Sequence, residues 1–190
     1  LFRSVVGPGT GIGVGALVSV GNKWKAVASE GGHIGYSPSG NIEKEIANVL
    51  NKEYYRISIE DLVSGRGLSN IYYALGVIKG MPYLKLHPAE ITRKATNEND
   101  EDCIETLRIF SGILGGYASD MAGTFNATGG VYLSGGVVPK IRQYFNETNF
   151  REKFEENEKL PFVKQIKTHM ILEENDALFG AASCYSGTFI

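Results

Sequence analysis

The stretch Gly129-Gly130-Val131-Tyr132-Leu133-Ser134-Gly135-Gly136 decides the fold class of this sequence. Its centre is a short apolar run between glycines, which is typical of a strand that is buried on both faces of a parallel sheet. Pro139 follows at a place where the first turn of a helix tolerates proline. A strand that runs through a glycine turn into a helix indicates an α/β protein.

Outward from this stretch, strands and helices alternate along the second half of the chain. A strand is predicted over 168–172, and a helix of small residues follows over 177–182. The longest helix is predicted over 102–121, where the apolar residues form one stripe. The stripe consists of Ile104, Leu107, Phe110, Ile113, Leu114, Tyr117 and Met121. The alternation supports the α/β class.

The first half of the chain begins with strands and continues with helices. Residues 13–20 and 24–28 flank a turn-prone stretch, Gly21-Asn22-Lys23, which predicts a β-hairpin. After the break at 37–40, the apolar spacing becomes helical, and helices are predicted over about 68–78 and 88–94. Ser58-Ile59-Glu60-Asp61 has the pattern of a capping box, which predicts a short additional helix.

Composition limits the kinds of protein that this chain can be. Its 190 residues are 43% apolar and 21% charged, which suits one domain with a sizeable core. The 19 basic and 21 acidic residues leave no basic surplus for binding nucleic acid. The two cysteines have no metal or disulfide spacing, and no apolar run approaches the roughly 18 residues of a membrane span. We expect a soluble, cytoplasmic protein.

The first candidate site is the glycine-rich stretch Gly7-Pro8-Gly9-Thr10-Gly11-Ile12-Gly13. Glycines let the backbone approach a ligand and direct N–H groups at phosphate oxygens, and the threonine hydroxyl adds a donor. The stretch is neither a Walker loop nor a dinucleotide fingerprint, because no Gly-Lys-Ser/Thr and no helix follow it. The alternative is a tight turn between two strands.

The second candidate site is Glu30-Gly31-Gly32-His33. The two glycines allow a sharp turn, so that the carboxylate and the imidazole converge on one small molecule. A carboxylate can accept hydrogen bonds from two neighbouring sugar hydroxyls, and an imidazole can donate or accept. The alternative is a surface turn in which His33 makes only local hydrogen bonds.

The third candidate site is Ser134-Gly135-Gly136-Val137-Val138-Pro139, a glycine turn between a strand and a helix. Open α/β sheets bind ligands at the carboxyl ends of their strands, which is where this turn lies. The alternative is an ordinary connection between the two elements. His87 and His169 stand beside apolar residues or proline and are interpreted as structural.

Five motifs in order make the sequence resemble the bacterial-type glucokinases, which are ATP-dependent kinases of the hexokinase/actin-like superfamily. The resemblance covers nearly the whole chain and favours the zinc-free group, because the CxCxxxGC cluster of the zinc-bearing group is absent. The motifs are GPGTGIGVG (7–15), SEGGH (29–33), ISIEDLVSGRGLSNIY (57–72), TGGVYLSGGVVPK (128–140) and ENDALFGAA (174–182).

The resemblance implies roles for residues of four motifs. The residues implied to contact the ATP phosphates are Gly9, Thr10 and Gly11. Those implied to line the adenosine pocket are Gly135, Gly136 and Val137. Those implied to bind glucose hydroxyls are Glu30, His33 and Glu60. Mg²⁺ would accompany ATP, and no residue is assigned to a protein-bound metal.

The resemblance also implies a domain organisation. Residues 1–175 would form the large domain, an actin-like (ribonuclease H-like) mixed sheet flanked by helices. Residues 176–190 would form a helix returning toward a small domain. The family's first phosphate loop and catalytic aspartate lie upstream of GPGTG, whereas only six residues precede Gly7 here. We therefore expect a piece of a longer protein, homodimeric as the parent, with no catalytic residue among these 190.

Two functions remain open at this point. The first is the sugar- and nucleotide-binding half of a glucokinase that phosphorylates D-glucose in glycolysis. The second is a non-catalytic sugar- or nucleotide-sensing regulator on the same fold. Neither function involves binding to a membrane, and neither requires nucleic acid to bind to these 190 residues.

Overall fold

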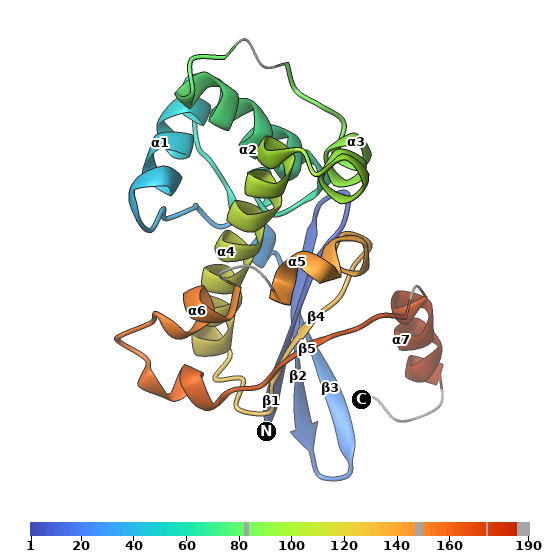
Figure 1. Ribbon diagram of the computed structural model, residues 1–190. Coiled ribbons are helices and arrows are strands. Elements are labelled where there is room, and N and C mark those ends of the chain that lie inside the picture. The colour runs from blue at the N-terminus through green and yellow to red at the C-terminus, as the bar shows by residue number, and fades with distance from the viewer. Residues whose placement is uncertain (82–83, 147–149, 174, 186–190) are drawn as a thin grey trace.

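A mixed five-stranded sheet forms one part of the molecule (Figure 1). The computed structural model describes residues 1–81, 84–146, 150–173 and 175–185. The strand order is β3-β2-β1-β4-β5. The strands are β1 (Phe2–Pro8), β2 (Ile12–Val20), β3 (Lys23–Ser29), β4 (Val131–Leu133) and β5 (Thr168–Met170). The expected α/β class with a mixed sheet is confirmed.

The two halves of the sheet differ in direction. β1, β2 and β3 form an antiparallel meander, in which Pro8 pairs with Ile12 across the first turn. β4 lies beside β1 and parallel to it, with Val6 opposite Leu133, and β5 extends the parallel half. Because β1 and β4 are parallel neighbours, the turns that follow them emerge at the same edge of the sheet.

Helices cover the sheet and extend beyond it. The chain forms α1 (Asn41–Leu50), α2 (Gly65–Ile78), α3 (Pro88–Arg93), α4 (Glu101–Thr124), α5 (Arg142–Asn146), α6 (Phe150–Glu155) and α7 (Asp176–Tyr185). The short turns are 3₁₀ helices at Gly31–His33, Ile59–Asp61, Val138–Ile141 and Pro161–Gln165, and a π-helical turn at Lys94–Glu98. No helix in the described part of the chain is long and apolar enough to cross a membrane.

The long helix α4 organises the hydrophobic core. It packs against β1, α2 and α6, and Leu107, Phe110 and Leu114 of the predicted stripe are completely buried. Figure 1 shows α4 running from the sheet to the end of the molecule where α1 and α2 lie. The Asp100 carboxylate accepts a hydrogen bond from the Cys103 N–H at 3.0 Å and caps the helix. The predicted helix over 102–121 is therefore confirmed.

The start of α2 and the turn before it differ from the sequence-based expectation, and β5 ends two residues earlier than predicted. Helix α2 begins at Gly65 rather than near Leu68, because the Ser64 hydroxyl accepts from the Gly67 N–H and caps the helix. The capping-box pattern at Ser58 produces a single 3₁₀ turn, in which the Ser58 N–H and hydroxyl both donate to the Asp61 carboxylate. The turn is short because α2 starts only four residues after it ends.

Candidate functional site

Two glycine turns meet at the sheet edge where β1 and β4 end. The Val137 N–H donates a hydrogen bond to the Pro8 carbonyl at 3.2 Å, which joins the second turn to the first. Gly135 has a φ of +82°, and a β-carbon there would lie 2.5 Å from the Pro8 carbonyl oxygen. Only glycine fits this conformation and this contact. The two glycine turns therefore lie together at one edge of the sheet.

A cleft of about 890 Å³ opens beside the two turns. Gly9 and Thr10 line it from the first turn, and Gly136 and Val137 line it from the second. Gly11 and Gly135 are not among the lining residues. The opposite wall comes from the start of α2 and from α3, and the Gly65 N–H donates to the Gly9 carbonyl at 2.8 Å. The volume suits a ligand of nucleotide size.

The cleft carries positive charge. Arg66, Arg93 and Lys140 are among its lining residues, together with His87. Arg93 Nη1 donates a hydrogen bond to Glu98 Oε1 at 2.5 Å, and this bond raises the pKa of the arginine. Exposed backbone N–H groups and arginine side chains are the usual donors to phosphate oxygens. The arrangement is suited to an anionic ligand.

Glu60 lies on the other side of the first glycine turn. Its Oε2 accepts a hydrogen bond from the Ile12 N–H at 3.2 Å. A β-carbon on Gly11 would stand only 2.4 Å from that oxygen, so the carboxylate approaches the backbone because residue 11 is glycine. The Glu60 side chain is 22% exposed. The first glycine turn therefore contributes to the cleft through Gly9 and Thr10 and holds a carboxylate through Gly11 and Ile12.

The turn at Glu30–His33 rests on the same isoleucine. A β-carbon on Gly32 would lie 2.6 Å from both Cγ2 and the carbonyl oxygen of Ile12, so the turn can be this close only with glycine. The Glu30 and His33 side chains are 90% and 61% exposed, and Oε2 and Nε2 are 3.7 Å apart. Both side chains are therefore available to a ligand from solvent.

Beneath this turn lies the hydroxyl of Tyr117 from α4. A β-carbon on Gly31 would stand 2.9 Å from that oxygen, which is buried and has no hydrogen-bond partner among the described residues. Burial, assisted by the Asp120 carboxylate, raises the pKa of Tyr117, so the hydroxyl stays protonated. Residue 32 must therefore be glycine because Ile12 lies so close, and residue 31 must be glycine because the Tyr117 hydroxyl does.

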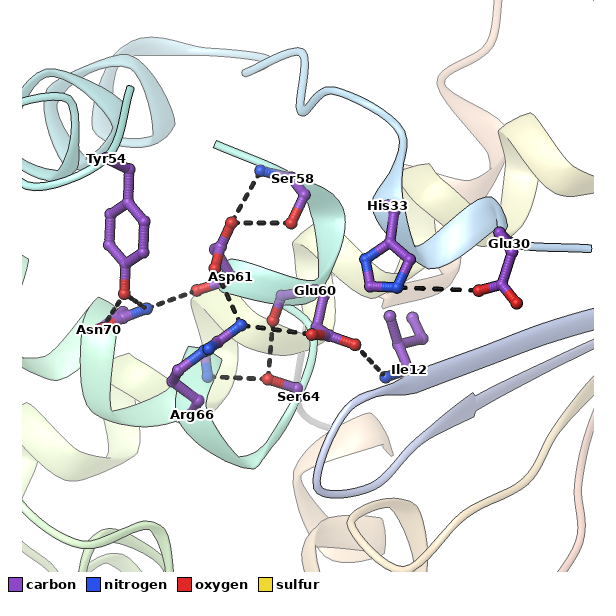
Figure 2. A network of polar contacts seen from close by, with 11 residues as sticks. Ile12, Glu30, His33, Tyr54, Ser58, Glu60, Asp61, Ser64, Arg66 and Asn70 are labelled. Atoms are coloured by element: carbon purple, nitrogen blue, oxygen red, sulfur yellow. Dashed lines mark hydrogen bonds and ion pairs between the residues drawn. The ribbon is translucent and has the colours of Figure 1, made fainter. Parts of the chain in front are cut away.

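Backbone hydrogen bonds hold the turn at Glu30–His33 beside the turn at Ile59–Asp61. The Ile59 N–H donates to the Ile34 carbonyl at 3.1 Å, and the Tyr36 N–H donates to the Ile57 carbonyl at 3.0 Å. Figure 2 shows the Glu60 carboxylate and the His33 ring near the same residue, Ile12. The structure thus brings together the two elements that carry Glu30, His33 and Glu60. No hydrogen bond joins Glu60 to Glu30 or His33 in the described part of the chain.

Arg66 is a site residue that sequence reasoning missed. Its Nη2 donates to Glu60 Oε1 at 3.3 Å and to Asp61 Oδ1 at 3.1 Å. This contact depends on where α2 begins, because the cap at Ser64 places Arg66, in the first turn of α2, beside the 3₁₀ turn at Ile59–Asp61. The Ser64 hydroxyl also donates to the Glu60 carbonyl at 2.7 Å. The one available signal was the Ser-Gly-x-Gly pattern of a helix start.

The described residues contain no group of three or more His, Cys, Asp or Glu side chains that could hold a metal ion. The carboxylate site and the cation-lined cleft adjoin each other at the first glycine turn. Such a pair of sites can hold a polyhydroxylated molecule beside a phosphorylated one.

Comparison with known proteins points the same way. Residues 2–188 match the family model described as Glucokinase. A curated relative, the glucokinase of Nitrobacter hamburgensis, is 38% identical over 180 residues, which are 94% of this chain and 56% of that protein. The chain thus spans a little more than half the length of the curated relatives that it matches.

Solved structures agree in fold. The crystal structure of a glucokinase from an Antarctic psychrotroph is 31% identical with a TM-score of 0.90, covering 96% of this chain and 57% of that one. The glucokinase of Balamuthia mandrillaris, solved in complex with glucose, gives a TM-score of 0.80 over 98% of this chain and 54% of that one. At 23% identity, the second likeness shows the fold alone. On the family match and the identities, this chain belongs to the glucokinase family.

Proposed function

We propose that this chain is the sugar- and nucleotide-binding part of a kinase that transfers the γ-phosphoryl group of ATP to the 6-hydroxyl of D-glucose. One observation carries the proposal. The turn whose Gly9 and Thr10 line the cationic cleft also holds the Glu60 carboxylate through Gly11 and Ile12. A donor and an acceptor of a phosphoryl group must be neighbours in this way.

Glu30, His33 and Glu60 are proposed to bind the sugar. A carboxylate has about four acceptor positions, and Glu60 uses one on each oxygen for Ile12 and Arg66. The remaining positions are free for sugar hydroxyls. Glu30 adds a second carboxylate and His33 adds a group that donates or accepts. The curated relatives that this chain matches are described as glucokinases, which supports glucose as the ligand.

The nucleotide is proposed to bind in the cleft. Gly9, Thr10 and Gly11 would contact the phosphates with backbone and hydroxyl donors, and Gly135, Gly136 and Val137 would line the adenosine pocket. Gly11 and Gly135 would act by shaping their turns, since neither lines the cleft. We propose that Mg²⁺ enters bound to ATP, because the ion bridges the phosphate oxygens in phosphoryl transfer.

Phosphoryl transfer also requires a base beside the 6-hydroxyl of the sugar. We nominate no catalytic residue within 1–190. Because the chain spans 56% of its Nitrobacter relative, we propose that the base belongs to the part of the parent kinase that this chain does not span. Residues 1–175 would be the large domain. Residues 176–190, of which 186–190 lie outside the described residues, would lead back toward the small domain. The parent is proposed to be a cytoplasmic homodimer acting in glycolysis.

A sensing regulator on the same fold is the less favoured function. The family model and the curated relatives that support this chain's membership are described as glucokinases. A regulator would require sugar or nucleotide binding without turnover in the parent protein.

The test is a coupled assay that detects glucose 6-phosphate. The parent protein should phosphorylate glucose with ATP and Mg²⁺, and Glu60→Gln in the parent should lower kcat/KM. The 190-residue chain alone should show no turnover. A rate of about 1 s⁻¹ or more from the chain would place the base within it. A parent protein that binds glucose but never phosphorylates it would favour the regulator.

A further inference from the structure

Arg66 lies between the cleft and the Glu60 carboxylate, which accepts a hydrogen bond from the Ile12 N–H. It is the second residue of α2, lines the cleft together with Gly9 and Thr10, and contacts Glu60 on its other side. Figure 2 shows its guanidinium directed at both Glu60 and Asp61. A single side chain therefore touches the proposed sugar carboxylate and the wall of the proposed nucleotide site.

The hydrogen bonds of Arg66 leave a large part of the guanidinium unused. Nη2 makes both contacts to the carboxylates, at 3.3 Å to Glu60 and 3.1 Å to Asp61. Nε and Nη1 have no partner among the described residues, and the side chain is 55% exposed. An arginine has five N–H donors in a planar fork, so three donors remain for a ligand.

Asp61 fixes this orientation of the arginine. Its side chain is only 8% exposed, and its Oδ2 is occupied by the N–H and hydroxyl of Ser58. Oδ1 accepts from Arg66, so the nearly buried carboxylate has its counter-charge. The arginine is thus anchored by Asp61, and it is one of the residues that line the cleft.

We infer that Arg66 is a positioning residue that couples nucleotide binding to sugar binding. An anionic phosphate in the cleft would accept hydrogen bonds from Nε and Nη1 while Nη2 keeps the Glu60 carboxylate in place. Asp61 holds one edge of the guanidinium, and a phosphate on Nε and Nη1 would hold the other. The Glu60 carboxylate on Nη2 would then be restrained before the sugar binds, which lowers the cost of binding the sugar. Each ligand should therefore tighten the other by the same factor. This inference rests on the proposed function.

The experiment measures the Kd of D-glucose by calorimetry, with and without saturating ADP, on the 190-residue chain. We expect saturating ADP to lower the Kd of glucose about fivefold, which is at the lower end of the usual range of coupling between two sites. In Arg66→Met the ratio of the two Kd values should fall to about one. Arg66→Lys keeps the charge but lacks the fork, so its ratio should also fall although ADP still binds.

Two further variants control for charge and folding. Arg93→Met removes a positive charge from the same cleft without touching Glu60, so it should weaken ADP but keep the fivefold ratio. Asp61→Asn combined with Arg66→Met avoids leaving a nearly buried carboxylate unpaired and should again give a ratio of one. Thermal unfolding would confirm that each variant is folded.

The outcomes separate this inference from the proposed function. The coupling role of Arg66 is wrong if Arg66→Met keeps the fivefold ratio of the two Kd values. It is also wrong if ADP does not change the glucose Kd of the unaltered chain while Glu60→Gln still weakens glucose binding. If Glu60→Gln leaves the glucose Kd unchanged, the sugar assignment of the proposed function fails, and the inference fails with it.

Discussion

At the scale of single residues, the absence of a β-carbon at position 11 lets the Glu60 carboxylate reach the backbone of β2. The glycine at position 13 is not required by any close contact, because a β-carbon there would meet nothing within 4 Å. The two glycines are two residues apart at the start of the same hairpin. They therefore offer a matched pair for testing what holds Glu60.

Gly11→Ala should weaken glucose binding by about tenfold, because displacing Glu60 costs a charged hydrogen bond worth roughly 1.5–3 kcal/mol. Gly13→Ala should leave the glucose Kd within about twofold. Calorimetric titration of both variants of the chain checks this. Equal effects of the two substitutions would mean that the contact between Gly11 and Glu60 does not matter for the sugar.

Glu30→Gln should also reduce sugar recognition. The substitution keeps the shape of this 90% exposed side chain but removes its charge as an acceptor. On the same range of roughly 1.5–3 kcal/mol, kcat/KM for glucose in the parent enzyme should fall by about tenfold or more. An unchanged kcat/KM would remove Glu30 from the site.

At the scale of elements, α4 shows how closely the helices pack. A β-carbon on Gly115 would lie 2.2 Å from the Phe150 carbonyl oxygen of α6, whereas one on Gly116 would meet nothing within 4 Å. The start of α6 can therefore come this close to α4 only because residue 115 is glycine. The small residue there is required by packing, and the next one is not.

Gly115→Ala should lower the free energy of unfolding by about 1–3 kcal/mol through overpacking. Gly116→Ala should raise it by up to about 1 kcal/mol, because alanine favours a helix over glycine. Urea denaturation of the two variants measures the difference. A stabilising Gly115→Ala would show that α6 shifts freely and that the close contact is not a constraint.

Elements that depend on local apolar patterns were predicted from the sequence, whereas a boundary that depends on a particular side-chain hydrogen bond was not. The strand at 131–133 and the long helix around 102–121 follow from local apolar patterns, and both are confirmed. The start of α2 at Gly65 was missed, because it depends on a serine cap that also bonds to the preceding turn. Apolar spacing carries no signal for such a cap.

The candidate site divides in the same way. The glycine turns and the polar residues of Glu30–His33 were found as motifs, because close backbone approach leaves a glycine signature. The role of Ile12 as the common support, and the contact of Arg66 with Glu60, were not found. They join residues up to 48 positions apart, and an isoleucine in a strand looks like any core residue.

At the scale of the whole molecule, α7 differs from the other helices. Leu178 and Phe179 are 70% and 61% exposed, and α7 stands apart from the sheet in Figure 1. Apolar side chains grouped in this way favour association with another surface.

We expect the 190-residue chain to self-associate with rising concentration through this face of α7. Leu178→Glu should shift sedimentation toward the monomer, because a charge would then be buried in the contact. Tyr55→Ser, at an exposed site outside α7, is the control and should change nothing. Association that is insensitive to Leu178→Glu would show that another face is responsible.

The most direct test of the whole account is a glucose titration of the ¹⁵N-labelled chain, followed through its backbone amides. We expect D-glucose to shift the amides of Ile12, of Gly31–His33 and of Glu60. We also expect Glu60→Gln to raise the Kd of glucose by about tenfold, because the substitution removes a charged acceptor. Glucose that shifts none of these amides, or that binds Glu60→Gln equally well, would contradict the claim that a sugar binds on the turn that borders the cleft.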